Sequence, residues 1–121
     1  MSYDSVMQNL LSQGYIHVCT ILDPQGNVYW TNNLEWTVDG PTLLSEWRKS
    51  QPAYHVGGTK FSAITRTDDT LVAKNIPQNA GTIILKQAPN GYFFLTWTSG
   101  DSELPPLNIQ AEVARMASVF R

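Results

Sequence analysis

The sequence contains few of the residues that most often carry catalysis, metal binding or disulfide cross-links. Cys19 is the only cysteine, and His17 and His55 are the only histidines. One cysteine rules out a disulfide framework within the chain, which is typical of a reducing compartment, and no Cys/His group has the spacing of a zinc site. A phosphate-binding loop and a Gly-x-Ser-x-Gly nucleophile motif are also absent. We therefore expect a non-enzyme without catalytic residues, metal or cofactor, and with Cys19 buried as a small apolar residue.

Charge and long hydrophobic runs are scarce as well. Charged residues make up 15% of the chain and the formal net charge is −2, which argues against a nucleic-acid binder that depends on phosphate contacts. No apolar run is long enough to span a membrane, and the N-terminus does not have the pattern of a secretion signal. These absences predict a cytoplasmic protein.

The charge that is present is unevenly distributed. Between Trp47 and Lys86 there are six bases and two acids, a balance of +4, whereas the remainder of the chain carries −6. One interpretation is scattered, solvated charge. The other is a basic face that meets an acidic partner. The six bases are Arg48, Lys49, Lys60, Arg66, Lys74 and Lys86.

Periodicity and turn signals predict a single α+β domain over residues 1–121. Hydrophobic residues make up 42% of the chain, enough for one core. Helices are expected at 2–13, about 40–49 and 107–120, with Asn108 as a candidate cap for the last. Strands are expected at 16–22, 28–31, 53–56, 60–67, 70–75, 81–87 and 92–98, and residues 32–39 fit either a further short strand or a loop. Sequential strands with short links indicate a central antiparallel sheet of six or seven strands. We expect the terminal helices together on one face and the remaining helix on the other.

A glycine pair, Gly57-Gly58, precedes a strand that carries exposed basic residues. Such a pair is a turn signal, since glycine adopts backbone angles that are closed to other residues. In the strand that follows, apolar and polar residues alternate. The pattern predicts one side with Phe61, Ala63 and Thr65, and the other side with Lys60, Ser62, Ile64 and Arg66.

The ordered set of motifs resembles profilin over essentially the whole chain. Gly57-Gly58-Thr59-Lys60-Phe61 is close to the family's Leu-Gly-Gly-x-Lys-Phe/Tyr, and Gly26-Asn27-Val28-Tyr29-Trp30 is similar to its Gly-x-Val-Trp. The opening Met1–Val6, the strand Ala80–Lys86 and the helix end Arg115–Ser118 resemble further family segments. The departures from the family pattern suggest a divergent profilin, of the kind reported from archaea related to eukaryotes or from early-branching eukaryotes.

The resemblance implies a monomeric, cytoskeleton-associated protein that binds monomeric actin and regulates its polymerisation. Matching motifs place the actin contacts on the later strands and on the first half of the closing helix. Lysines on that face can steer toward an acidic surface, and its alanines allow a partner backbone to come close. The implied contacts are Lys60, Ser62, Ile64, Lys74, Pro106, Leu107, Gln110, Ala111 and Ala114.

A second family function is binding of proline-rich segments between the terminal helices, where aromatic rings stack on a polyproline helix. The residues that match this groove are Tyr3, Val6, Tyr29, Trp30, Val119 and Phe120. Several depart from the family pattern, since Val6 replaces the usual tyrosine and Val119 stands where animal relatives often have histidine. We therefore expect weak or altered binding of proline-rich proteins.

Phosphoinositide binding, a third family function, uses basic patches that overlap both sites, and eight bases leave a phosphoinositide membrane surface as a possible partner. Two other classes share the expected layout. One is a small-molecule sensor module, which needs an internal polar cavity. The other is a roadblock- or longin-type scaffold that regulates GTPases, which usually forms dimers.

Overall fold

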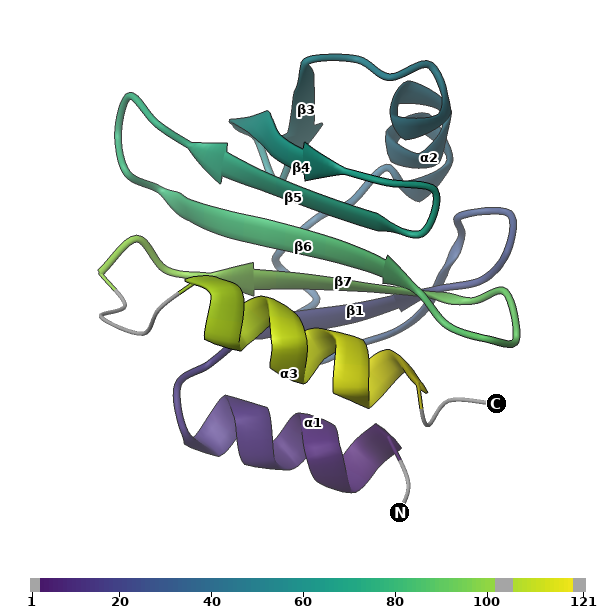
Figure 1. Ribbon diagram of the computed structural model, residues 1–121, viewed down its shortest axis with the longest axis vertical. Helices are drawn as coiled ribbons and strands as arrows, with labels where there is room; N and C mark the ends of the chain where they lie inside the picture. Colours follow the sequence, from purple (N-terminus) through teal and green to yellow (C-terminus); the bar gives the residue numbers. More distant parts are fainter. Residues whose placement is uncertain (1–2, 102–105, 119–121) are drawn as a thin grey trace.

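The chain forms a seven-stranded antiparallel sheet with helices on both faces, as the computed structural model shows (Figure 1). The structure describes residues 3–101 and 106–118. The strand order across the sheet is β2-β1-β7-β6-β5-β4-β3. The strands are β1 (Val18–Leu22), β2 (Val28–Thr31), β3 (Ala53–Val56), β4 (Thr59–Arg66), β5 (Thr70–Asn75), β6 (Gly81–Gln87) and β7 (Phe93–Thr98). This arrangement confirms the predicted α+β class.

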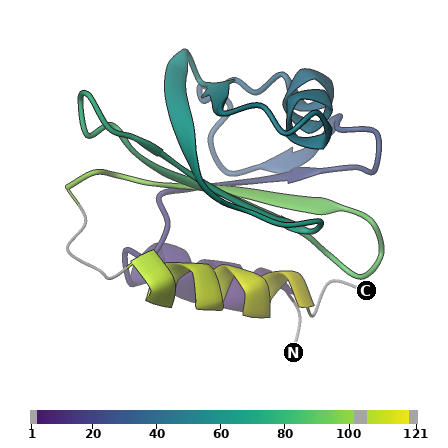
Figure 2. The same cartoon turned by 45° about the horizontal axis from the view of Figure 1, so that its top comes forward.

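The helices divide between the two faces of the sheet as predicted. Helices α1 (Tyr3–Ser12) and α3 (Pro106–Ser118) lie side by side on one face, and α2 (Gly40–Arg48) lies on the other (Figure 2). Each face has its own core, since side chains alternate across a strand. The core under α1 and α3 includes Leu10, Ile84 and Val113. None of the helices in the described residues is long and apolar enough to cross a membrane.

Most predicted boundaries agree with the structure to within two residues, and four strands (β2, β3, β5 and β6) match at both ends. Residues 32–39 contain a turn and no strand, which settles the choice left open by the sequence.

The predicted cap Asn108 is wrong: α3 already begins at Pro106, so Asn108 lies inside the helix. Proline suits this position because the first helical amides have no intrahelical partner.

The glycine pair forms the turn of the β3–β4 hairpin. Gly57 and Gly58 have φ values of 59° and 80°, the left-handed conformations that a two-residue hairpin turn of type I′ requires. The Gly57 amide donates to the Thr37 carbonyl at 3.0 Å. A Cβ at Gly57 would lie 2.8 Å from Nε1 of Trp36, so the indole occupies the space that a side chain would fill. Both backbone freedom and packing therefore select glycine at this position.

Strand β4 contains an irregularity that the sequence did not reveal. Ala63 pairs with Ala73 of β5, but the next paired residue is Thr65, opposite Val72, so Ile64 is an extra residue in the ladder. Such a bulge shifts the alternation of the residues beyond it by one position. Arg66 therefore pairs with Leu71, a residue of the core on the α2 face. The prediction that Arg66 shares a side with Lys60 is wrong for this reason.

Candidate functional site

Strands β4, β5 and β6 carry a strip of polar side chains on the sheet face that α3 only partly covers. Ser62 pairs with Lys74, and Lys74 pairs with Thr82 of β6. Residues directly opposite in an antiparallel ladder project to the same face, and Lys60 joins them because it lies two residues before Ser62. Lys60 and Lys74 are exposed, whereas Ser62 and Thr82 are half-buried. The face is the one with α1 and α3, since Val72, two residues before Lys74, belongs to that core.

The outer side of α3 continues this strip. The inward side of the helix is apolar, with Ile109, Val113, Met116 and Ala117 buried. Leu107 is 78% exposed, Ala111 is exposed, and Gln110 and Ala114 are half-buried. We call the strip of Lys60, Ser62, Lys74 and Thr82, together with Leu107, Gln110, Ala111 and Ala114 of α3, the lysine face.

The structure thus brings together most of the predicted actin contacts. Pro106 begins α3 and lies next to this surface along the chain, although its side chain lies outside the described residues. Ile64 is 59% exposed, but as the extra residue of the bulge it has no ladder partner that fixes its direction. It lines a shallow depression with Pro52 and Arg66 at the outer edge of β4. Ile64 therefore borders the lysine face at most.

A buried asparagine, which the sequence did not single out, holds the strands of the lysine face in place. Asn75, only 2% exposed, donates from Nδ2 to the Lys60 carbonyl at 2.8 Å. Its Oδ1 accepts the amides of Gln78 at 3.2 Å and Ala80 at 3.0 Å. One side chain thus connects β4 to the β5–β6 turn. Buried polar groups are expected to have such partners, and here they fix the backbone that presents Lys60.

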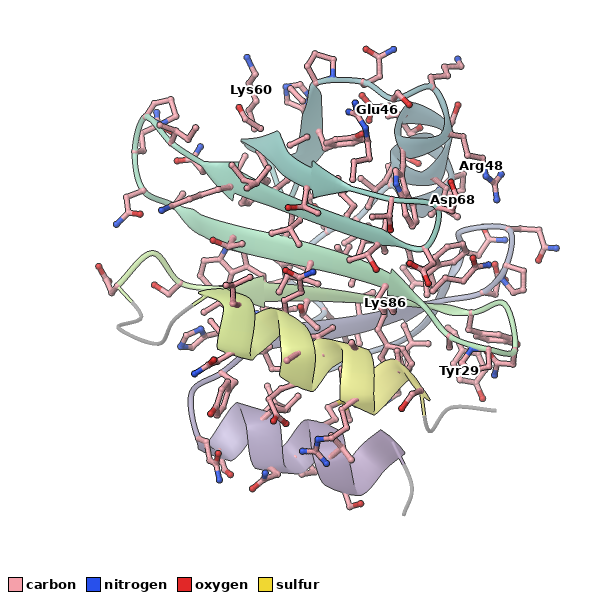
Figure 3. The ribbon with its side chains drawn as sticks, in the orientation of Figure 1. Tyr29, Glu46, Arg48, Lys60, Asp68 and Lys86 are labelled. Carbon is pink, nitrogen blue, oxygen red and sulfur yellow. The ribbon has the colours of Figure 1, made fainter. Side chains whose placement is uncertain are left out.

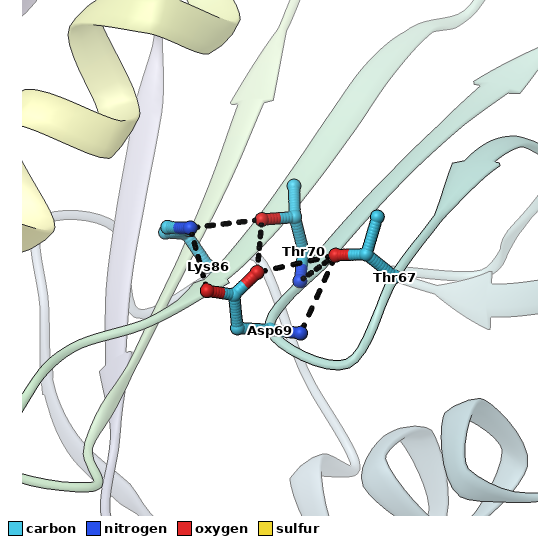
Figure 4. A network of polar contacts seen from close by, with 4 residues as sticks. All are labelled: Thr67, Asp69, Thr70 and Lys86. Atoms are coloured by element: carbon cyan, nitrogen blue, oxygen red, sulfur yellow. Dashed lines mark hydrogen bonds and ion pairs between the residues drawn. The ribbon is translucent and has the colours of Figure 1, made fainter.

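Lys86, near the end of β6, is held by a network around the β4–β5 turn (Figure 4). Its Nζ lies 3.0 Å from Oδ2 of Asp69 and donates to Oγ1 of Thr70 at 3.0 Å. Oδ1 of Asp69 accepts from the hydroxyls of Thr67 at 3.1 Å and Thr70 at 3.0 Å. The hydrogen bond from Lys86, with those from the threonines and the nearby positive charge, lowers the pKa of Asp69. Asp68 and Asp69 are a turn and not a paired-carboxylate site, because only Asp69 takes part in this network.

The bases between Trp47 and Lys86 do not form one continuous face. By their ladder positions, Lys60, Lys74 and Lys86 project toward the side of α1 and α3. Arg48 and Arg66 instead line a shallow pocket with Asp68, and Figure 3 shows Arg48 and Asp68 beside α2. Arg66 donates from Nη1 to the Gln51 carbonyl at 2.7 Å. The prediction of a basic face therefore applies only to Lys60, Lys74 and Lys86, since Lys49 lies at the end of α2.

The predicted polyproline residues are only partly brought together. Tyr29 is 59% exposed on the edge strand β2 and packs edge-on against Tyr92 at a centroid distance of 5.3 Å, while Trp30 beside it is 37% exposed. Val6 is 2% exposed and belongs to the core under the helices, so the structure does not offer it as a surface contact. The side chain of Tyr3 and the residues Val119 and Phe120 lie outside the described residues.

Cys19 is fully buried in strand β1, as expected for a small apolar residue. Burial raises the pKa of its thiol to about 12, so the reactive thiolate is suppressed. Across residues 3–101 and 106–118, no three His, Cys, Asp or Glu side chains are grouped so that they could hold a metal ion.

Comparison with known proteins points to one class. No family model matches the sequence. The chain is 27% identical to Thor profilin of a Thorarchaeota archaeon (strain AB_25) over 104 residues, which cover 84% of this chain and 79% of that protein. It is 33% identical to Heimdall profilin of a Heimdallarchaeota archaeon (strain LC_2) over 78 residues, which cover 63% and 64% of the two chains.

Solved structures agree with the sequence relatives. The crystal structure of LokiProfilin1 superposes with a TM-score of 0.76 at 16% identity and covers 95% of this chain and 92% of its own. Acanthamoeba castellanii profilin IA superposes with a TM-score of 0.76 at 17% identity, and the match covers 95% of this chain and 92% of that one. The chain therefore has the profilin fold. Together with its sequence relatives, this confirms the resemblance to a divergent profilin of the Asgard archaeal type.

Proposed function

We propose that this protein binds monomeric actin through the lysine face and thereby regulates actin polymerisation. The observation that carries the proposal is the alignment of Lys60 and Lys74 on one exposed strip beside α3. This strip corresponds to the later strands and closing helix that the profilin resemblance assigns to actin. LokiProfilin1 and LokiProfilin2 share the fold, with TM-scores of 0.74 and 0.77, and each was solved in complex with rabbit actin.

The chemistry of the lysine face suits a protein partner with an acidic surface. Lys60 and Lys74 supply exposed cations, which accelerate encounter with a negatively charged surface. The exposed Leu107 offers an apolar anchor at the start of α3. Ala111 and Ala114 present little bulk, so a partner backbone can approach the helix closely. By occupying the barbed-end side of an actin monomer, the protein would block part of nucleation and still allow delivery to filament ends.

The test is a binding assay with latrunculin-treated monomeric actin. The wild-type chain is expected to form a complex, and Lys60→Glu to weaken it by about tenfold, because the substitution places an anion against an acidic surface. Lys49→Glu is the matched control: Lys49 is an exposed lysine at the end of α2, away from the lysine face, so affinity should stay near the wild-type value. Failure of the wild-type chain to bind any actin would contradict the function. If Lys60→Glu binds actin as tightly as the wild-type chain, the assignment of the lysine face as the binding surface is wrong, but actin binding itself is not contradicted.

A second candidate function is weak binding of proline-rich segments at Tyr29 and Trp30. The two exposed rings supply flat surfaces of the kind that polyproline helices use, but the burial of Val6 limits how far the groove extends. Titration of a ten-proline peptide, followed by tryptophan fluorescence, should give a dissociation constant in the millimolar range. Micromolar binding would show that the groove is complete.

A further inference from the structure

Lys86 lies on the same side of the sheet as the lysine face, although the sequence motifs did not assign it to a partner. Along β6 it is two residues from Ile84 and four from Thr82, so all three project to the side of α3. Lys86 lines a small pocket with Ala114 and Ser118 of α3. Ala114 already belongs to the lysine face, so Lys86 extends that face along the helix.

The Lys86 side chain is 21% exposed, and its ammonium group is engaged by Asp69 and Thr70. The two partners differ in accessibility. Thr70 is buried, whereas the side chain of Asp69 is 57% exposed. An ion pair with one exposed partner is open to competition from another carboxylate, because exposed pairs contribute little free energy.

The Asp69 carboxylate is not required to close the β4–β5 turn. The Thr67 amide donates to the Thr70 carbonyl at 2.8 Å, and the Gln87 amide donates to the Asp69 carbonyl at 2.9 Å. These backbone hydrogen bonds persist if the carboxylate turns away. Thr70 would still hold the ammonium group in position while its ionic partner changes.

We propose that Lys86 is a further partner-binding residue of the lysine face and that Asp69 competes with the partner for it. An acidic side chain of the partner would replace Asp69 at the Lys86 ammonium group, so Asp69 attenuates affinity. This inference rests on the proposed function, since it assigns an additional contact to the same face. The competing carboxylate is charged at neutral pH, as an aspartate ordinarily is, and the hydrogen bond from Lys86 lowers its pKa further.

The experiment compares two adjacent aspartates at low ionic strength, where exposed charges are least screened. Asp69→Asn is expected to tighten binding to monomeric actin by about two- to fivefold, the range set by an exposed ion pair. Asp68→Asn removes the same charge one residue away, on the α2 side, and should change affinity by less than about 1.5-fold. When Lys86 is also replaced by methionine, Asp69→Asn should change the affinity for actin no more than Asp68→Asn does.

Equal affinities of Asp69→Asn and Asp68→Asn, in a series where the wild-type chain binds, would overturn the inference and leave the proposed function intact. A series in which the wild-type chain binds no actin would instead contradict the proposed function, and the assigned contact with it.

Acetylation of Lys86 in the free protein, followed by mass spectrometry, tests the ion pair without a partner. Acetylation should be faster in Asp69→Asn than in the wild-type chain and unchanged in Asp68→Asn; equal rates in all three would overturn the inference.

Discussion

Tyr54 gives the sharpest test of how the core on the α2 face is packed. The residue is 0% exposed in β3, directly opposite Phe61 of β4, and its hydroxyl is the one buried side-chain polar atom among the described residues without a hydrogen-bond partner. A buried hydroxyl that has lost its water and gained no partner costs about 1–3 kcal/mol. Phenylalanine keeps the ring and removes that cost.

The substitution Tyr54→Phe is therefore expected to stabilise the protein. Removing the oxygen also forfeits some of its van der Waals contacts, which reduces the gain to about 0.5–2 kcal/mol. Urea denaturation followed by tryptophan fluorescence measures the change, with the slope of the transition unchanged because the same surface is exposed on unfolding.

Tyr29→Phe serves as the control for Tyr54→Phe. Its hydroxyl belongs to a side chain that is 59% exposed, so the free energy of unfolding should change by less than about 0.5 kcal/mol. A loss of stability in Tyr54→Phe larger than that of the control would show that the Tyr54 hydroxyl has a partner and would refute the reasoning.

Three further predictions follow from individual contacts. Gly40→Ala should destabilise the fold by about 2 kcal/mol or more, because a Cβ would lie 1.7 Å from the carbonyl oxygen of Gly26 and neither backbone can move freely. Urea denaturation measures the change, and a stability equal to that of the wild-type chain would contradict this packing. Asp69→Asn should lower stability at pH 7 by at most about 1 kcal/mol, since the residue is largely exposed. Because the folded pKa of Asp69 is lowered, this stabilisation is present above the unfolded pKa of about 3.8 and is lost as the pH falls through the folded value, so the two unfolding curves should converge in acid. The Cys19 thiol, with a pKa of about 12, should react with Ellman's reagent at pH 8 only after denaturation, and rapid reaction in the native state would contradict its burial.

The parts of the fold that the sequence predicted are those set by local chemistry. The helix start at α2 follows from Asp39, whose carboxylate accepts the Thr42 amide at 3.3 Å, and from Pro41 in the first turn. The β3–β4 turn follows from two glycines that tolerate positive φ. Such signals involve residues only a few positions apart, so they can be read without knowing the partner strand.

The parts that the sequence did not predict depend on contacts between distant residues. The bulge at Ile64 is defined by its pairing with β5, and the local alternation of apolar and polar residues gave no sign of it. The pairing of Lys86 with Asp69 joins residues 17 positions apart, and Asn75 reaches across 15 positions to Lys60. The resemblance to profilin placed Lys60 and Lys74 in the candidate site, but only the ladder shows that they share one face.

The most direct test of the lysine face is cross-saturation NMR of the labelled protein bound to unlabelled monomeric actin. Signal loss is expected at amides of β4 around Lys60–Ser62, of β5 around Lys74, and of α3 from Leu107 to Ala114. Amides of α2 and of the turn between β1 and β2 should be unaffected, since they lie away from that face. Signal loss confined to α2 and β3, with none on β5 or α3, would contradict the assignment of the lysine face as the actin-binding surface.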